Sequence, residues 1–332
     1  MLKQNDYFPH VNLLRGIAAL MVCVYHFSHF QCFDGSLFSK EDWIYRIGEY
    51  GSQGVTAFFV ISGFVIPFSM HKGQYVYRAF GRFLVKRSIR IEPPYIATII
   101  VILLIGYYLS RRWGNPFEFH PEQFALHIGY LIPFSEYEWY NPVFWTLAIE
   151  FQYYILMALI FPLITGNNRI MRHLVLAVFL AGHFLPQYKS TLPEHAGIFI
   201  PGIVLFLYRA GYFKPAEMLG WFFASLCLLF YDQSLVICVI TMLTFFAIWL
   251  LRSDTKAGNW LGNISYSLYL LHGSTGMMFL LFRSSSTFST LDKYGAFLLA
   301  VLISLIAAYV FWFFVEQPSK IMSQNFKLHK PK

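Results

Sequence analysis

The chain alternates between long apolar stretches and short polar segments. A helix needs about 20 residues to cross a hydrocarbon core of about 30 Å, and most of the apolar stretches approach that length. The predicted spans are residues 12–30, 51–70, 93–110, 142–164, 173–186, 196–208, 218–231, 235–251, 261–282 and 295–315. The stretches 173–186, 196–208 and 218–231 are shorter, so we expect tilted, buried or re-entrant helices there. The pattern predicts an all-α, polytopic membrane helical bundle of about ten transmembrane helices.

Composition agrees with this pattern. The 332 residues are 57% hydrophobic and 13% charged, whereas soluble domains contain about 25% charged residues. The net charge of +8 falls mainly in short loops between apolar stretches, where membrane topology accounts for it. We therefore expect contact with membrane lipids and no nucleic-acid partner. The cysteines show no metal-type pairing, and we expect no bound metal.

Lysine and arginine are unevenly distributed over the predicted loops. Most of the 25 basic residues lie on one side of the membrane if the N-terminus is cytoplasmic. This bias places both N- and C-termini in the cytoplasm. We expect no cleavable signal peptide. We also expect a single integral membrane domain over residues 1–332, ending in a short cytoplasmic polar tail at 318–332.

The first predicted span carries an arginine near one end and histidines near the other. Arg15 and His26 are eleven residues apart, which is three helical turns plus roughly 20°, or about 16 Å along one face. His29 lies only about 40° from that face. Ionisable groups inside a membrane helix are costly and normally face the protein interior. The spacing predicts a cation and a titratable base on one interior face, and it leaves both histidines as candidates.

The second span contains GVTAFFVISG, at residues 54–63. Small residues in a membrane helix allow a close helix contact or a local break. Packing is the more frequent role of such a stretch. The alternative is that Ser62 and a loosened backbone at Gly63 line a cavity.

A basic stretch, RFLVKRSIR, precedes the third span, and we expect Pro93 and Pro94 to mark the beginning of that span. Positive charge here would anchor a cytoplasmic loop. It would equally suit a polyphosphate, because residues at i and i+3 present their guanidinium groups on one helical face. The candidate phosphate-binding residues are Arg82, Lys86, Arg87 and Arg90.

The fourth predicted span begins at Asn-Pro and carries Glu150 among apolar residues. An intramembrane carboxylate requires a partner or a water-filled cavity. Glu150 is expected about 12 Å below the outer surface and His26 roughly 8 Å below it. The similar depths predict a carboxylate–histidine pair, and Tyr153 and Tyr154 follow one turn later.

Two further stretches carry polar groups. GNISYSLYLLH begins the ninth span and contains Asn263, Ser265 and His272. A lone histidine in a helical bundle more often forms an interhelical hydrogen bond than acts as a catalyst. Glu316 closes the last span and is interpreted as an ordinary interfacial acid.

Together and in this order, these stretches resemble the acyltransferase-3 family of integral membrane acyltransferases, which O-acylate, most often O-acetylate, bacterial surface and exported glycans. The resemblance covers nearly the whole chain. Two positions depart from the family pattern: Thr56 replaces a usual acidic residue, and Glu92 precedes Pro93 where an aromatic residue is usual. The matching motifs are LRGIAALMVCVYH, GVTAFFVISGFVI, RFLVKRSIRIEPPY, FWTLAIEFQYY, LGNISYSLYLLH and VEQP.

The resemblance implies a multi-pass protein of the bacterial inner membrane with cytoplasmic termini. It selects His26 over His29, because Arg-x10-His in the first helix is the family signature. It also matches the arginine pair to Arg87 and Arg90, and the serine–glycine pair to Ser62 and Gly63. The implied reaction is O-acylation with an acyl-CoA donor, expected to be acetyl-CoA, and without a bound cofactor.

As catalytic residues we expect His26, Glu150 and Arg15. His26 would be the general base on a hydroxyl or a covalent acyl relay, and Glu150 would orient it as the third group of a triad does. The acyl-CoA would contact Ser62, Gly63 and the basic residues of the third motif. Oxyanion or acceptor contacts are expected from Asn263, Ser265, Tyr153 and His272.

The expected acceptor is an exported or lipid-linked glycan, with a periplasmic partner or a second copy of the chain as further partners. Two alternatives stay open. One is acylation of a small molecule from the cytoplasmic side. The other is a transporter or flippase of an acyl or lipid-linked substrate, because such proteins also use intramembrane ionisable residues. Release of CoA without a membrane gradient would separate an enzyme from a transporter.

Overall fold

The described part of the chain is almost entirely helical, as the sequence predicts. The computed structural model describes residues 8–32, 35–114, 116–185, 190–283 and 290–328. A two-residue hairpin of β1 (Gln31–Cys32) and antiparallel β2 (Gly35–Ser36) is the exception within those ranges. The α-helices are α1 (Pro9–Ser28), α2 (Trp43–Glu49), α3 (Gly54–Lys72), α4 (Phe80–Trp113), α5 (Pro121–Ile128), α6 (Trp145–Thr165), α7 (Arg169–Ala181), α8 (Leu192–Arg209), α9 (Pro215–Asp232), α10 (Leu235–Leu250), α11 (Lys256–Leu271), α12 (Met278–Arg283), α13 (Thr290–Phe311) and α14 (Gln317–Asn325).

Short 3-10 and π-helical turns connect or extend these elements. The 3-10 turns are η1 (Tyr50–Gln53), η2 (Tyr77–Ala79), η3 (Ile132–Phe134), η4 (Pro142–Phe144) and η5 (Gly182–Phe184). Two π-helical turns, η6 (Gly273–Met277) and η7 (Trp312–Glu316), interrupt the C-terminal helices. Such π turns often occur at functional sites. Here η6 follows His272 directly, and η7 ends at Glu316.

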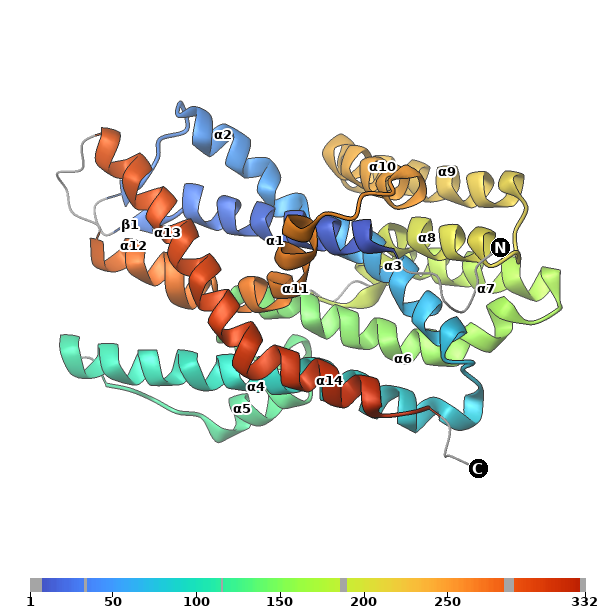
Figure 1. Ribbon diagram of the computed structural model, residues 1–332, viewed down its shortest axis with the longest axis horizontal. Helices are drawn as coiled ribbons and strands as arrows, with labels where there is room; N and C mark the ends of the chain where they lie inside the picture. The colour runs from blue at the N-terminus through green and yellow to red at the C-terminus, as the bar shows by residue number, and fades with distance from the viewer. Residues whose placement is uncertain (1–7, 33–34, 115, 186–189, 284–289, 329–332) are drawn as a thin grey trace.

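The long helices α1, α4, α6 and α8 lie roughly along the longest axis of the molecule (Figure 1). Each of the ten predicted spans overlaps helix, and residue 186, at the end of the span 173–186, lies outside the described residues. Five helical segments in the described ranges are long and apolar enough to cross a membrane. They are Pro9–Ser28, Trp43–Lys72, Tyr77–Trp113, Pro142–Thr165 and Asp292–Asn325.

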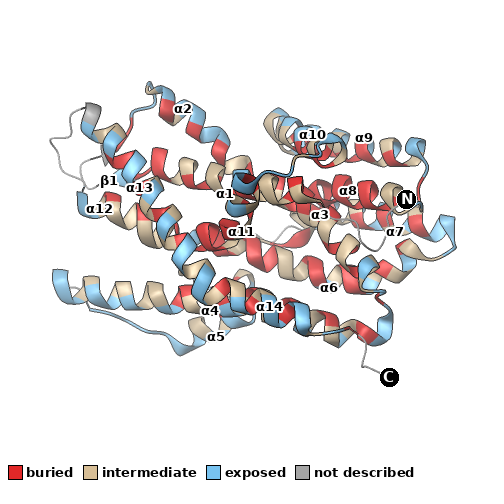
Figure 2. Cartoon of the chain, in the orientation of Figure 1, coloured by how far each residue is buried: buried red, intermediate tan, exposed pale blue. Residues whose placement is uncertain are grey.

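Helix α8 forms a buried core among α3, α6, α7, α9 and α10. Residues 196–207 are buried without interruption, and Figure 2 shows α8 as mostly buried where α4 exposes much of its length. A helix that is apolar on all sides is stable only when other elements surround it, and α3, α9, α10, α7 and α6 all contact α8. The predicted span 196–208 is therefore a buried core helix, one of the alternatives that its short length allows.

Glycine contacts determine how the central helices pack. A Cβ atom on Gly63 of α3 would meet the backbone of α8 at Phe199, and one on Gly202 of α8 would meet the backbone of α3. In the same way, Gly16 of α1 and Gly262 of α11 bring those helices together. Small residues allow this close approach in membrane proteins. The resulting α1–α11 contact places α11 alongside both ends of the Arg15–His26 face.

Helix α4 corrects one expectation. Pro93 and Pro94 lie inside α4 and do not mark the beginning of a helix. The turn after them is buried at Tyr95 and Thr98, and the Thr98 hydroxyl donates to the Pro94 carbonyl oxygen at 2.9 Å. Packing of this turn stabilises the helix although the prolines remove two backbone donors.

Candidate active site

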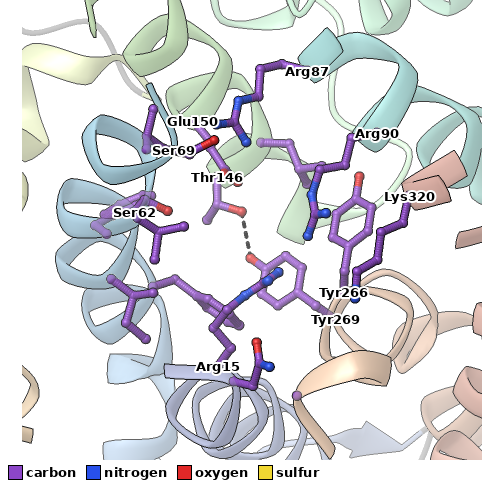
Figure 3. Close-up of a pocket in the computed structure, with 18 of the residues that line it drawn as sticks. Arg15, Ser62, Ser69, Arg87, Arg90, Thr146, Glu150, Tyr266, Tyr269 and Lys320 are labelled. Atoms are coloured by element: carbon purple, nitrogen blue, oxygen red, sulfur yellow. Dashed lines mark hydrogen bonds between the residues drawn. The ribbon is translucent and has the colours of Figure 1, made fainter. Parts of the chain in front are cut away.

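The bundle encloses a cavity of about 410 Å³, here called cavity 1. Side chains from α1, α3, α4, α6, α11, η7 and α14 line it, and Arg15, Arg87 and Arg90 extend into it from two different helices (Figure 3). Its charged lining residues are Arg15, Arg87, Arg90, Lys320, Glu150 and Glu316. Four cations and two carboxylates give the cavity a positive balance.

The two carboxylates of cavity 1 accept hydrogen bonds from hydroxyl groups. Tyr154 donates to Glu150 over 2.6 Å. Ser267 donates to Glu316 from its hydroxyl over 2.6 Å and from its backbone N–H over 3.1 Å. Glu316 is buried. Each carboxylate is thus stabilised without a cation in contact.

The four cations of cavity 1 have no carboxylate partner. In the described ranges every ion pair lies elsewhere in the molecule. Lys320 donates to the side-chain oxygen of Asn263 at 3.2 Å. Arg87 lies over the rings of Phe83 and Tyr154, 5.2 and 5.4 Å from their centroids, and its Nε is buried without a partner. Clustered cations of this kind are costly unless an anion neutralises them, so the geometry favours an anionic ligand.

His26 lies three turns along α1 from Arg15 and pairs with His272, the residue that directly follows α11. Their Nδ1 and Nε2 atoms, respectively, are 3.1 Å apart. The Nδ1 of His272 lies 2.8 Å from the carbonyl oxygen of Tyr269 and 3.2 Å from that of Leu268. Carbonyl oxygens only accept, so we assign the His272 proton to Nδ1, which leaves its Nε2 as an acceptor.

This pairing also determines which ring nitrogen of His26 carries the proton. The Nδ1 of His26 faces two acceptors, the Nε2 of His272 and the Val22 carbonyl oxygen at 2.9 Å. It must therefore carry the proton, and Nε2 of neutral His26 keeps its lone pair. No hydrogen bond from the described residues ends on that Nε2 atom. His26 is thus held in the tautomer that a base or a nucleophile requires.

His26 and His272 line a second cavity of about 290 Å³, here called cavity 2. Its other walls come from the second half of α4, from η4 and the residues before it, and from η6 with the beginning of α12. Most of these side chains are apolar. His26 therefore lies in the wall of a largely apolar space.

One hydrogen-bond cluster lies at the boundary between the cavities. Tyr269 and Thr146 line cavity 1, while their helical neighbours His272 and Val143 line cavity 2. The Tyr269 hydroxyl is 2.8 Å from the Thr146 hydroxyl (Figure 3) and 3.1 Å from the Val143 carbonyl oxygen. This boundary cluster of Tyr269, Thr146 and Val143 joins α11 to the start of α6.

The predicted pair of His26 and Glu150 does not form among the described residues. His26 lines cavity 2 and bonds to His272, whereas Glu150 lines cavity 1 and bonds to Tyr154. The close α1–α11 contact at Gly16 and Gly262 explains this difference, because it places an α11 side chain beside His26. His29 lines neither cavity and lies against the Tyr45 ring, with 3.9 Å between centroids.

The residues predicted to contact acyl-CoA divide into two groups. Arg87, Arg90 and Ser62 line cavity 1. Three others do not: Arg82 is partly exposed, Lys86 donates to the Phe326 carbonyl oxygen at 2.9 Å, and Gly63 packs against α8.

The predicted oxyanion or acceptor contacts also divide. Asn263 lines cavity 1 and His272 lines cavity 2. Ser265 is buried and donates to the Gly262 carbonyl oxygen within its own helix at 2.8 Å. Tyr153 is buried beside α3, where its hydroxyl donates to the Gly63 carbonyl oxygen at 3.4 Å. Neither of these two lines a cavity named above.

Several lining residues were not predicted from the sequence. Glu316 and Lys320 complete the charged set of cavity 1, and Thr146, Tyr266 and Tyr269 form part of its wall. One signal was available for the charged pair: Glu316 and Lys320 are four residues apart and therefore share a helical face. That face points inward here, since η7 ends at Glu316 and α14 continues from it.

Comparison with known proteins places this geometry in a wider context. A family model described as an acyltransferase domain matches residues 8–316. A protein of Acidianus two-tailed virus, provisionally named an acetyltransferase, is 28% identical over 212 residues. That match covers 63% of this chain and 57% of the viral protein, so it spans little more than half of the relative's length. No solved structure matches the chain.

Proposed function

The chain belongs to the acyltransferase-3 family, and on that premise we propose that it is a membrane-bound O-acyltransferase. Its donor is acetyl-CoA from the cytoplasm, and its acceptor is a hydroxyl of an exported or lipid-linked glycan. One observation carries the proposal: α1 joins the cationic cavity 1, at Arg15, to a histidine with a free basic nitrogen, at His26. A single helix thus links an anion-binding space to a reactive base.

Cavity 1 suits the donor because CoA carries several phosphate groups. The guanidinium groups of Arg87 and Arg90 can form charge-assisted, forked hydrogen bonds to phosphate oxygens. Arg15 and Lys320 line the same space without a carboxylate partner. Bound phosphates would neutralise these cations, which are otherwise costly to bury.

His26 supplies the chemistry through Nε2. It removes the proton from the acceptor hydroxyl while the hydroxyl oxygen attacks the thioester carbonyl carbon. The carbon–sulfur bond then breaks, the acyl group stays on the acceptor oxygen, and the CoA sulfur receives the proton. His272 holds His26 in the required tautomer, because its Nε2 accepts a hydrogen bond from the Nδ1–H group of His26. The same Nε2 atom would form the acyl bond if His26 acts as a covalent relay.

We propose the membrane arrangement that the charge pattern predicts: ten spans, cytoplasmic termini and a bacterial inner-membrane location. Arg87 and Arg90 then lie on the cytoplasmic side, where CoA is available. His26 and His272 lie further towards the outer surface. Labelling of single cysteines introduced after Lys256 and after Trp113, in intact and in permeabilised cells, tests this arrangement. Labelling of the first position in intact cells would contradict it.

The function is tested with purified protein in detergent and radiolabelled acetyl-CoA. The wild type is expected to release CoA and to transfer the label to an acceptor fraction or to a histidine. His26→Ala should lower that rate at least about 100-fold, because a general base contributes that much or more.

His29→Ala is the matched control. It removes the same side chain one turn further along α1 from a position that lines neither cavity. A folded His26→Ala protein that keeps CoA release would overturn the assignment. Uptake into vesicles that depends on a gradient and releases no CoA would indicate a transporter instead.

A further inference from the structure

Cavity 2 differs from a carbohydrate site in its lining. Among the residues that the structure describes, none that lines cavity 2 is Asp, Glu, Lys or Arg. Its apolar walls come from α4, η4, η6 and α12, and they include Ile102, Ile105, Leu109, Val143, Met277 and Met278. A neutral, apolar space favours a neutral ligand with a hydrocarbon part.

Most polar groups around cavity 2 already have partners. The Asn141 side chain accepts from the Val143 N–H at 3.2 Å and donates to the Leu270 carbonyl oxygen at 3.3 Å. Both ring nitrogens of His272 are bonded, and so is Nδ1 of His26. The Tyr140 hydroxyl is buried without a partner, so it does not face a ligand in the cavity. The polar groups left for a ligand are Nε2 of His26 and the hydroxyl of Ser274, which also lines the cavity.

The small number of available polar groups restricts which ligands can bind in cavity 2. A free sugar carries several hydroxyl groups, and each one that loses water without gaining a partner is costly. The available groups satisfy about one ligand hydroxyl. The rest of the ligand inside cavity 2 must be hydrocarbon to match the walls, so the other hydroxyl groups of a glycan must lie outside it.

We propose that cavity 2 is the acceptor site and that it holds the reacting hydroxyl of a lipid-linked acceptor beside the hydrocarbon of its lipid anchor. This inference rests on the proposed role of His26. Because His26 lines cavity 2 and not cavity 1, the hydroxyl that it deprotonates must lie in cavity 2. Of the two acceptors proposed above, the lipid-linked glycan therefore fits, with its lipid chain along the second half of α4, and a free polysaccharide does not.

The test measures binding without catalysis. The full-length protein is placed in phosphatidylcholine nanodiscs and photolabelled with a hexadecanol analogue that carries a diazirine on its chain. Labelled peptides are then mapped by mass spectrometry. Labelling is expected on residues 102–109 and 273–278, stronger than with the matching hexadecane probe, reduced by excess hexadecanol and unaffected by glucose.

Two glycine variants sharpen the test. Gly106 lines cavity 2, and a Cβ atom there meets only Phe117, at 3.5 Å. Gly106→Leu should therefore fill the cavity and lower this labelling about tenfold. Gly81→Leu makes the same change in the same helix at a position with no neighbour within 4 Å of the new Cβ. It should leave the labelling unchanged.

Each contrary result has a defined meaning. Labelling that glucose reduces, or that Gly106→Leu leaves unchanged, would overturn the inference. Displacement by palmitoyl-CoA but not by hexadecanol would assign cavity 2 to the acyl chain of the donor and would also overturn it. Because the measurement needs no turnover, it remains separate from the CoA-release test. Alcohol binding without CoA release would refute the transferase and leave the alcohol site in place.

Discussion

Cavity 1 is lined by four cationic side chains and two carboxylates, whereas cavity 2 has no Asp, Glu, Lys or Arg among its described lining residues. Both cavities use α1 and α4, and each receives one member of the Arg15–His26 pair. Under the proposed function this contrast is a division of labour: the polyanionic donor matches cavity 1, and the neutral acceptor matches cavity 2.

The boundary cluster of Tyr269, Thr146 and Val143 lies between the two contrasting cavities. Tyr269 at the end of α11 and His272 just after it lie one turn apart but line different cavities, as do Thr146 and Val143. A change on one side of this boundary should therefore affect one substrate only. Three variants test that separation.

The largest effect is expected from removing charge in cavity 1. Arg87→Gln combined with Arg90→Gln should weaken CoA binding at least about 100-fold, because each hydrogen bond to a charged group contributes about 1.5–3 kcal/mol. Titration calorimetry with CoA measures this loss. Photolabelling of cavity 2 should stay unchanged. Arg82→Gln is the control, since Arg82 does not line the cavity; an equal loss there would show that general positive charge accounts for the binding.

A smaller effect is expected from His272→Phe. Without the acceptor at its Nδ1 side, His26 is less firmly held in its tautomer, and kcat should fall about tenfold, in the range found for groups that orient a ligand or base. The KM for acetyl-CoA should not change, because His272 does not line cavity 1. His272→Asn keeps an oxygen acceptor and should recover part of the rate. A rise in KM with no recovery would point to a purely structural role.

The smallest effect is expected at the boundary cluster. Tyr269→Phe removes the bonds to Thr146 and Val143, each worth about 1 kcal/mol, and allows the ring to move more freely. Release of CoA in the absence of acceptor should then rise about fivefold, because water reaches the thioester more often. Thr146→Val removes one of these bonds and should have a weaker effect. Unchanged or slower release in both variants would show that the boundary does not limit access.

The fold could largely be predicted from the sequence, because long apolar stretches allow little except helices in a membrane bundle. Arg87 and Arg90 line the same cavity, as their spacing predicts, because that spacing depends only on the geometry of one helix, whereas Arg15 and His26 line different cavities. The short length of the stretch 196–208 allowed a buried helix as one alternative, and the structure shows a buried core helix there. Pro93 and Pro94 show the limit of local rules, because tertiary packing carries α4 through them.

The contacts between helices could not be predicted in the same way. Depth along the membrane suggested Glu150 as the partner of His26, but depth says nothing about which helix lies alongside. That choice depends on Gly16 and Gly262, whose missing side chains bring α11 against α1. Glu316 was similarly misread as interfacial, because a π-helical turn places it inside the bundle.

The hydroxyl pair of Tyr269 and Thr146 has a consequence for the bioenergetics of the cell. A continuous thread of water between the two faces of an energised membrane would conduct protons and short-circuit the gradient. Under the proposed membrane arrangement, the 2.8 Å contact between these two side chains lies on the path that such a chain of water would follow. The proposed group transfer would then proceed without a proton leak.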